Sequence, residues 1–332
     1  MSEAPALPPV GGSAAPAPVG LFQFSIEGRR APALFVTGWV LFLVGLSGTV
    51  VGFLSGGTAT VVLAGGVAIL SIALLLLGGS QTVEREAAGR AYAGPSPVLL
   101  FAAIVAVTLL AAFLVGAPLE ALGVQLDKPL GDLVLSIVQA AVFIGMVALM
   151  VVGPGALKWS DMGIQLPIGR ALQALAGGAV FAVPVVVITA VIAAGLVVLF
   201  GVTPPSPLPP TGTSSGLVLH LLVGAVVAPI SEEIVFRGVA VTAWAREMPA
   251  VTAIVRAALL FAFAHVLLVT GSSASEAASL AIVGAAGRLP IALALGWLYL
   301  RWGTIWAPIG LHAAFNAILI VASELSLGPL GG

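Results

Sequence analysis

The chain has 332 residues, of which 60% are hydrophobic and only 8% are Asp, Glu, Lys or Arg. Soluble globular domains carry about 25% charged residues, so this composition excludes a water-soluble protein and indicates one that lies in a lipid bilayer. The formal charge of -1 at pH 7 provides no basic surface for nucleic acid. The absence of cysteine excludes disulfides, thiolate metal sites and cysteine nucleophiles.

The first 30 residues are rich in Ala and Pro. They lack the basic segment followed by an apolar run that a cleavable signal needs, so we expect residues 1–30 to form a disordered cytoplasmic tail. Beyond the tail, a membrane-spanning helix requires about 20 mostly apolar residues. The segments that meet this requirement are 33–54, 59–78, 97–117, 132–152, 171–200, 216–237, 251–270, 277–300 and 304–322.

The basic residues predict the orientation of these spans, because cytoplasmic loops hold the excess of Lys and Arg. Alternate loops carry Arg29, Arg30, Arg85, Arg90, Lys158, Arg170, Arg246 and Arg301. The predicted fold is therefore an all-α polytopic transmembrane helix bundle of about nine spans, with the N-terminus inside and the C-terminus outside. Within the first span and just after it, Gly48, Gly52 and Gly56 form a ridge of small residues on which another helix can pack closely.

Ionisable residues inside the later spans are the candidate functional groups, since a charge at the bilayer centre costs about 2.5–3.5 kcal/mol on insertion scales. The sixth span ends in APISEEIVFRG, which contains Glu232, Glu233 and Arg237. Glu233 and Arg237 are four residues apart and are expected to form a salt bridge. Glu232 points about 100° away around the helix, which leaves it free for a chemical role.

Two histidines on other spans complete the set. The seventh span contains LLFAFAHVLL, with Phe261 one turn before His265, and the ninth contains GLHAAFNA, with His312 and Asn316 on one face. Their depths allow one shared site in the cytoplasmic half of the bilayer. A purely structural network of interhelical hydrogen bonds is the alternative.

Three further ionisable residues lie in the later spans outside these motifs. His220 lies toward the other face from Glu232, and we interpret it as a packing or interfacial residue. Arg256 is positioned to extend its charged end to the cytoplasmic interface. Arg288 lies in the middle of its span, where it either pairs with a buried carboxylate or meets an acidic end of a substrate.

The motifs EExxxR, FxxxH and HxxxN, in this order on successive late spans, resemble those of the CPBP intramembrane protease family, also called Abi, which includes the type II CAAX prenyl endopeptidases. The resemblance extends over residues 170–322. It implies helices packed around a cavity open to the cytoplasm, within which peptide bonds are hydrolysed. The implied organisation is a protease core at 161–325, preceded by a transmembrane region of unknown role at 31–160.

The resemblance also implies a role for each motif residue. Glu232 matches the general base and His265 its partner in holding the attacking water. His312 and Asn316 match the positions that stabilise the oxyanion, and Glu233 and Arg237 match a supporting pair.

The metal requirement is open, because family names describe metalloproteases whereas the zinc motif HExxH is absent. If a divalent metal such as zinc binds, its candidate ligands are Glu232, His265 and His312.

We therefore expect a multi-pass protein of a bacterial inner membrane that cleaves membrane proteins or hydrophobic peptides in contact with the lipid bilayer. The sequence indicates neither the substrate nor the oligomeric state. Two alternatives are a non-catalytic membrane binding or immunity protein, and a proton-coupled transporter whose Glu and His residues relay protons.

Overall fold

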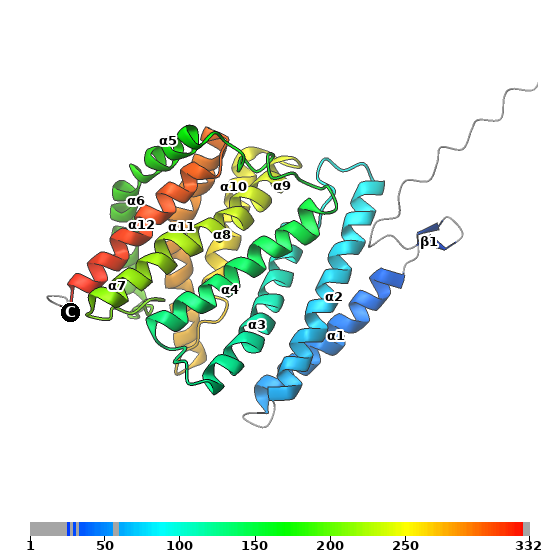
Figure 1. Cartoon of the computed structure of the whole chain (residues 1–332), viewed down its shortest axis with the longest axis horizontal. Coiled ribbons are helices and arrows are strands. Elements are labelled where there is room, and N and C mark those ends of the chain that lie inside the picture. Colours follow the sequence, from blue (N-terminus) through cyan, green and yellow to red (C-terminus); the bar gives the residue numbers. More distant parts are fainter. Residues whose placement is uncertain (1–24, 27–28, 31–32, 56–59, 328–332) are drawn as a thin grey trace, which may run out of the picture.

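The computed structural model describes residues 25–26, 29–30, 33–55 and 60–327, and within these ranges the chain is almost entirely helical (Figure 1). The main helices are α1 (Ala33–Leu54), α2 (Thr60–Ala87), α3 (Pro97–Ala121), α4 (Pro129–Val147), α5 (Ile168–Ala179), α6 (Ala182–Phe200), α7 (Ser214–Leu221), α8 (Ala228–Glu233), α9 (Thr242–Ala245), α10 (Ala250–Ala264), α11 (Ala274–Trp302) and α12 (Trp306–Leu325). Three π-helical segments are η2 (Ala148–Val152), η3 (Leu222–Val227) and η4 (Ile234–Val241).

Most of the expected N-terminal tail lies outside the described residues. Its described part is a two-stranded antiparallel pairing of β1 (Ser25–Ile26) with β2 (Arg29–Arg30). The prediction of a disordered tail therefore concerns residues that the structure mostly does not describe.

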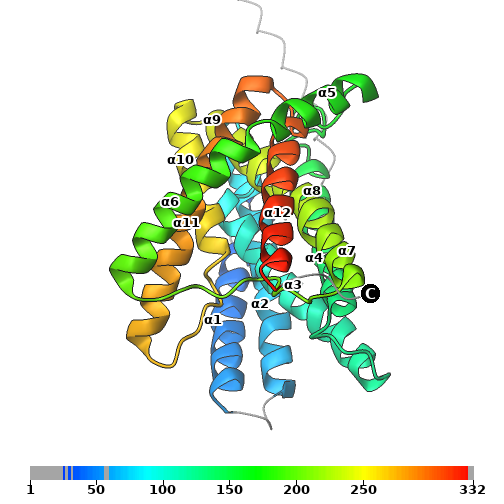
Figure 2. The ribbon, with the colours of Figure 1, turned by 90° about the vertical axis from the view of Figure 1, so that its left-hand side faces the viewer.

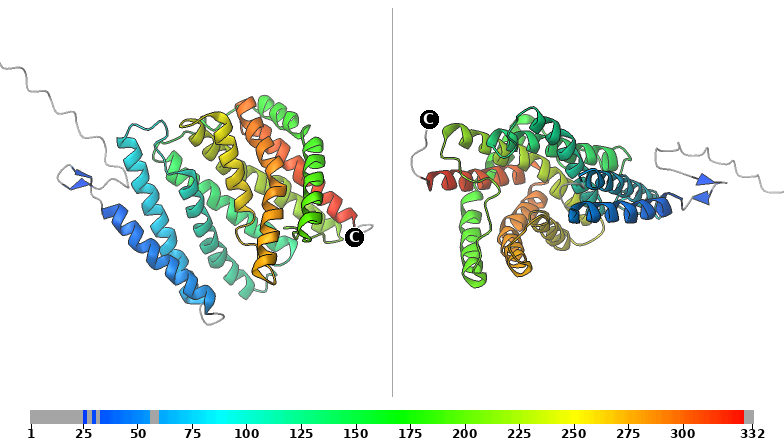
Figure 3. Two further views of the ribbon diagram at one scale, coloured as in Figure 1. Left: turned by 180° about the vertical axis from the view of Figure 1, so that it is seen from behind. Right: turned by 90° about the horizontal axis from the view of Figure 1, so that it is seen from below.

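Helices α1 and α2 form an antiparallel hairpin at the edge of the bundle (Figures 1 and 3). Glycines let the two helices approach: a Cβ on Gly48 would lie 3.1 Å from the Cα of Gly66, and a Cβ on Gly52 would lie 2.5 Å from the Cα of Leu63. The predicted packing role of this ridge is thus confirmed for Gly48 and Gly52, while Gly56 lies outside the described residues.

Among the described residues, eight helical stretches are long and apolar enough to cross a membrane, and large apolar side chains such as Val198 (84% exposed) lie on their outer surface. This is the surface of a multi-pass membrane protein, because a bilayer, unlike water, accommodates exposed apolar side chains.

The prediction of nine full-length spans is wrong for the seventh. Helix α10 has only 15 residues and ends at Ala264, whereas the predicted segment ran from 251 to 270. The residues that follow include Val269, Thr270 and Gly271, which have low helix propensity. Helix α10 begins at the face where α9 ends, but α11 begins at the opposite face, so α10 and residues 265–273 together connect the two faces (Figure 2).

The fifth predicted span is bent into α5 and α6. Pro184 has no backbone N–H, so the carbonyl of Val180 lacks its helical donor and the helix turns there. Helix α5 packs on the start of α12, where a Cβ on Gly178 or Gly310 would collide with backbone atoms of the other helix. This close contact anchors the beginning of the helix that carries His312.

The bundle is built around the continuous helix from α7 to α9, residues 214–245. Seen from below, α12 lies between α4 and α7 on one side and α6 and α11 on the other (Figure 3). The largest buried cluster joins α3, α4, η4 and α10, and contains Phe101, Phe236 and Phe261. The central helix is therefore surrounded by packed helices over most of its length.

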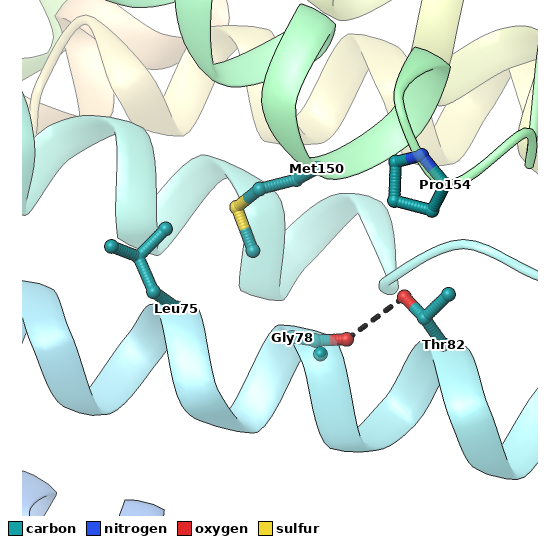
Figure 4. Close-up of a pocket in the computed structure, with 6 residues that line it drawn as sticks. Leu75, Gly78, Thr82, Met150 and Pro154 are labelled. Atoms are coloured by element: carbon teal, nitrogen blue, oxygen red, sulfur yellow. Dashed lines mark hydrogen bonds between the residues drawn. The ribbon is translucent and has the colours of Figure 1, made fainter. Parts of the chain in front are cut away.

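Two hollows in the structure do not include the candidate residues. One, of about 10 Å³, lies between α2 and η2, where the Met150 side chain projects toward Leu75 and Gly78 (Figure 4). It is at the lower limit for one water molecule. The other is an open, entirely apolar groove of about 400 Å³ along Ala317–Leu325 of α12.

Candidate functional site

The two adjacent carboxylates lie on α8, a short α-helical stretch between the π-helical segments η3 and η4. In a π-helix, each backbone N–H donates a hydrogen bond to the carbonyl five residues earlier, and such segments often occur at functional sites. Glu233 is completely buried, and Glu232 is 9% exposed. The two carboxylates therefore have different surroundings although they are neighbours in sequence.

Glu233 is held by two partners. Its Oε1 accepts hydrogen bonds from Arg237 Nη1 and from His312 Nδ1, both at 2.8 Å. Arg237 is fully buried, donates a second hydrogen bond to the carbonyl of Ala292 at 3.1 Å, and lies 4.6 Å from the centre of the Phe261 ring. The predicted salt bridge between Glu233 and Arg237 is confirmed as a buried pair, in which Glu233 Oε2 and Arg237 Nε have no hydrogen-bond partner within the described residues.

Glu232 faces the two histidines. Its Oε2 lies 3.8 Å from His265 Nε2 and 3.9 Å from His312 Nε2. This oxygen is buried and has no hydrogen-bond partner within the described part of the chain. Two nitrogens and one oxygen thus converge at a separation that one water molecule can bridge with hydrogen bonds of about 2.8 Å.

The second nitrogen of each histidine fixes the orientation of its ring. His265 Nδ1 lies 2.8 Å from the Phe261 carbonyl, which can only accept, so Nδ1 carries a proton. His312 Nδ1 donates to the carboxylate of Glu233. Both Nε2 atoms are therefore the ones directed to Glu232.

Phe261 supports the whole cluster. Its ring centre lies 4.4 Å from that of His265 and 5.8 Å from that of His312, and it also packs against Phe236. The sequence motif marks Phe261 only as the residue one turn before His265. Its contact with His312 and Arg237 depends on how three helices pack, which no local pattern signals, and the same holds for the Ala292 carbonyl.

Asn316 is placed differently from the other five predicted residues. Its Nδ2 donates to the carbonyl of Gly224, in η3, at 2.7 Å. The residue lies on the His312 face of α12, one turn further along, and one amide hydrogen remains available. The structure thus brings together Glu232, Glu233, Arg237, His265 and His312, and leaves Asn316 beside the cluster.

His220 lies apart from this site. It is 2% exposed, and its Nε2 is 3.4 Å from Asp132 Oδ2, an ion-pair separation without hydrogen-bond alignment. Toward the same end of the bundle, the Glu324 carboxylate accepts hydrogen bonds from the backbone N–H groups of Thr211 and Gly212. His220 is therefore an interior residue and not an interfacial one.

Arg256 and Arg288 also differ in position. Arg256 is exposed on α10. Arg288 is partly buried on α11, and its Nη1 donates to the Gly284 carbonyl at 2.8 Å. Among the described residues it forms no ion pair within 4.0 Å, so the first of its two alternatives, a pair with a buried carboxylate, is not found.

Polar contacts outside the membrane-spanning segments join connecting loops of the bundle. Arg246 Nη2 lies 3.0 Å from Asp161 Oδ2, and the Lys158 N–H donates to the same oxygen at 3.0 Å. The Lys158 amide, together with Arg246, holds the pKa of Asp161 below its usual value. Burial raises the pKa of Tyr92, on the loop before α3.

The candidate metal ligands have suitable atoms but a wide spacing. Neighbouring ligand atoms of a tetrahedral zinc site are about 3.3 Å apart, whereas Glu232 Oε2 lies 3.8 and 3.9 Å from the two Nε2 atoms. Within the described ranges, no group of three or more His, Asp or Glu residues has the spacing of a metal site. This arrangement fits a water molecule better than a metal ion.

Comparison with known proteins identifies the region that carries this site. The family model of the type II CAAX prenyl endopeptidase Rce1-like proteins matches residues 214–318, which run from α7 into α12 and include all six predicted residues. No curated protein and no solved structure matches the chain. Helices α1–α6 lie outside the matched region. Residues 214–318 of this multi-pass membrane protein are therefore similar to the Rce1-like type II CAAX prenyl endopeptidases.

Proposed function

We propose that the chain is an intramembrane endopeptidase that hydrolyses peptide bonds of membrane-associated proteins or hydrophobic peptides. The observation that carries the proposal is the buried Glu232 oxygen, which lacks a partner and faces two histidine nitrogens at 3.8 and 3.9 Å. The similarity of residues 214–318 to a family of endopeptidases supports the same activity.

The number of protons at the site favours one division of roles. A water molecule has two hydrogens, but Glu232 Oε2 and two neutral Nε2 atoms would be three acceptors. For all three to bond to one water molecule, one of them must donate. We assign this donor role to His312 Nε2, because its Nδ1 bonds to the Glu233 carboxylate at 2.8 Å, whereas His265 Nδ1 bonds to a neutral carbonyl.

With this assignment, hydrolysis follows in two steps. Glu232 accepts a proton from the water held by His265, and the water oxygen forms a bond to the carbonyl carbon of the substrate. His312 Nε2–H stabilises the resulting oxyanion, and the free amide hydrogen of Asn316 is a second candidate donor. The carbon–nitrogen bond then breaks as the proton passes from Glu232 to the leaving amine. One well-placed oxyanion donor contributes about 2.7–4 kcal/mol.

We propose that water activation requires no metal, on the ground of the wide spacing described above. If a zinc ion does bind, Glu232, His265 and His312 would hold it, and it would supply a Lewis acid. Elemental analysis of purified protein should find less than stoichiometric zinc, and activity should survive chelation. One zinc per chain together with loss of activity on chelation would contradict this proposal.

We also propose that the protein lies in a bacterial inner membrane, with the face where α10 begins toward the cytoplasm. The loops at that face hold Arg90 and Arg246, in agreement with the excess of basic residues expected on the cytoplasmic side.

The test compares new protein termini in membranes of cells that express the parent chain or E232Q. The matched control is E120Q, which makes the same chemical change at an exposed carboxylate on α3. Termini present with the parent and E120Q, but absent with E232Q, would establish the protease and name its substrates. Identical termini in all three, with folded protein at equal abundance, would refute the proposal. Proton-coupled uptake without cleavage would instead support a transporter.

A further inference from the structure

Arg288 is a charged residue that the proposed mechanism does not use. It lies 14 residues from each end of α11, which is about 21 Å along the helix axis in either direction. Its guanidinium is thus at the middle of the membrane-spanning helix. Its recorded hydrogen bond goes to Gly284 of the same helix, one turn earlier.

The position of Arg288 brings it close to the site. A Cβ on Gly284 would lie 3.3 Å from Arg288 Nη1 and 3.1 Å from Cγ1 of Val266, the residue after His265. The guanidinium therefore lies beside the segment that carries His265. It is near enough to Glu232 and His265 for its charge to act on both, but the Glu232 carboxylate is not within the 4.0 Å of an ion pair.

The charge of Arg288 has no bonded counterion. Among the described residues, no carboxylate forms an ion pair with it, so its positive charge lies partly buried without a partner. Four of the five guanidinium N–H groups have no hydrogen bond in the described structure, which leaves the planar fork free for an anion.

We propose that Arg288 binds a carboxylate of the substrate next to the bond that is cleaved, and so selects substrates with an acidic group at that position. The inference rests on the proposed endopeptidase function. A guanidinium binds a carboxylate with two parallel hydrogen bonds, which fixes orientation as well as charge. The carboxylate is either the free C-terminus of a chain or the side chain of Asp or Glu.

The experiment measures binding without turnover, so that its result does not depend on catalysis. The protein is the full chain with E232Q, purified in detergent. The probes are N-dodecanoyl dipeptides that contain a photoreactive leucine, with a free C-terminal carboxylate, with a C-terminal amide, or with a C-terminal amide and a Glu side chain. Photolabelling is compared between R288Q, R288K and the control R256Q, which removes an exposed arginine from α10. Each variant is first checked for a single elution peak and an unchanged Tm.

We expect the free-acid probe to label the Arg288 protein about tenfold more than the amide probe. The ratio of acid to amide labelling is compared between variants, because the two probes partition differently into detergent. R288Q should bring this ratio close to one, R288K should retain part of it, and R256Q should leave it unchanged. Labelling by the Glu probe in place of the free acid assigns the carboxylate to a side chain.

Two results would overturn the proposal: an acid-to-amide ratio that is unchanged in R288Q, or one that falls equally in R256Q. Either would mean that Arg288 does not bind the carboxylate of the probe. If cleavage is absent in cells but this ratio depends on Arg288, the proposed endopeptidase function fails while the carboxylate site stands.

Discussion

At the scale of the residue, the site shows how two identical neighbours acquire different chemistry. Oε1 of Glu233 accepts hydrogen bonds from Arg237 and His312, although its Oε2 is buried without a partner, whereas Glu232 directs an unpartnered oxygen toward two histidine nitrogens. The first carboxylate stabilises a buried charge cluster. The second is available to a water molecule, because nothing in the described structure competes for it.

Replacing each of these carboxylates by the neutral amide should therefore affect different properties: the cleavage rate for Glu232 and the stability for Glu233. E232Q should lower the cleavage rate by about 10²–10⁴-fold, as expected for loss of a general base, and should leave Tm nearly unchanged. E233Q should lower stability by about 3–5 kcal/mol, because Arg237 then remains buried without its partner. Thermal unfolding in detergent and cleavage of an identified substrate measure the two effects. Equal losses of stability in both variants would contradict this division of roles.

Asp161 gives the pH dependence that can be argued outside the membrane. Its folded-state pKa lies below the unfolded value, so its contribution to stability is present above the unfolded pKa and is lost as pH falls through the folded one. D161A should therefore lower Tm at pH 7, and the deficit should shrink at about pH 3. The effect should be small, because the ion pair with Arg246 is about one-third exposed on each side. A deficit of equal size at both pH values would refute the electrostatic origin.

At the scale of the element, periodicity and composition predicted most helices, and the i, i+4 spacing predicted the Glu233–Arg237 pair. The bend between α5 and α6 and the early end of α10 were missed, because hydropathy counts apolar residues and not backbone hydrogen bonds. The π-helical segments η3 and η4 have no known sequence signal, yet η3 presents the Gly224 carbonyl to Asn316. The positions of Phe261 and Asn316 depend on contacts between helices, which a single sequence does not encode locally.

The site depends on the contact between helices α5 and α12. A Cβ on Gly310 would collide with the Leu175 backbone, and Gly310 is two residues before His312, so G310A should displace the start of α12. We expect a lower Tm and a lower kcat in this variant. The matched control is G169A on α5, where nothing lies within 4 Å of an added Cβ. This control should be neutral or stabilising by up to about 1 kcal/mol through helix propensity. Unchanged Tm and kcat in G310A would contradict this prediction, because they would mean that α5 and α12 can move apart without a loss of stability or activity.

At the scale of the whole molecule, the candidate site depends on the segment of α10 and the residues after it. Hydropathy predicts a membrane span there, but the helix itself is too short to be one. Helix α10 is too short to span a bilayer, but it delivers His265 to the interior, and residues 265–273 continue to the far face (Figure 2). Because this segment is not helical, its backbone groups must be satisfied by protein or water inside the bundle. An irregular segment next to Glu232 thus supplies a polar region within the membrane, where a water molecule can reach the site.

The crossing by α10 and residues 265–273 can be tested because the chain contains no native cysteine. Single cysteines are introduced at Ala250, at the start of α10, and at Ser275, at the start of α11, both of which are exposed. With the N-terminus inside, S275C should react with a membrane-impermeant maleimide in intact cells, and A250C only after permeabilisation. S206C and A88C, in other exposed loops, mark the outer and inner faces in the same assay.

Labelling of A250C and S275C on the same side would mean that residues 250–273 enter and leave the membrane at one face. The C-terminus would then lie on the same side as the N-terminus. Labelling on opposite sides means that nine crossings carry the chain through the bilayer, although only eight helices in the described part of the chain are long enough to span it.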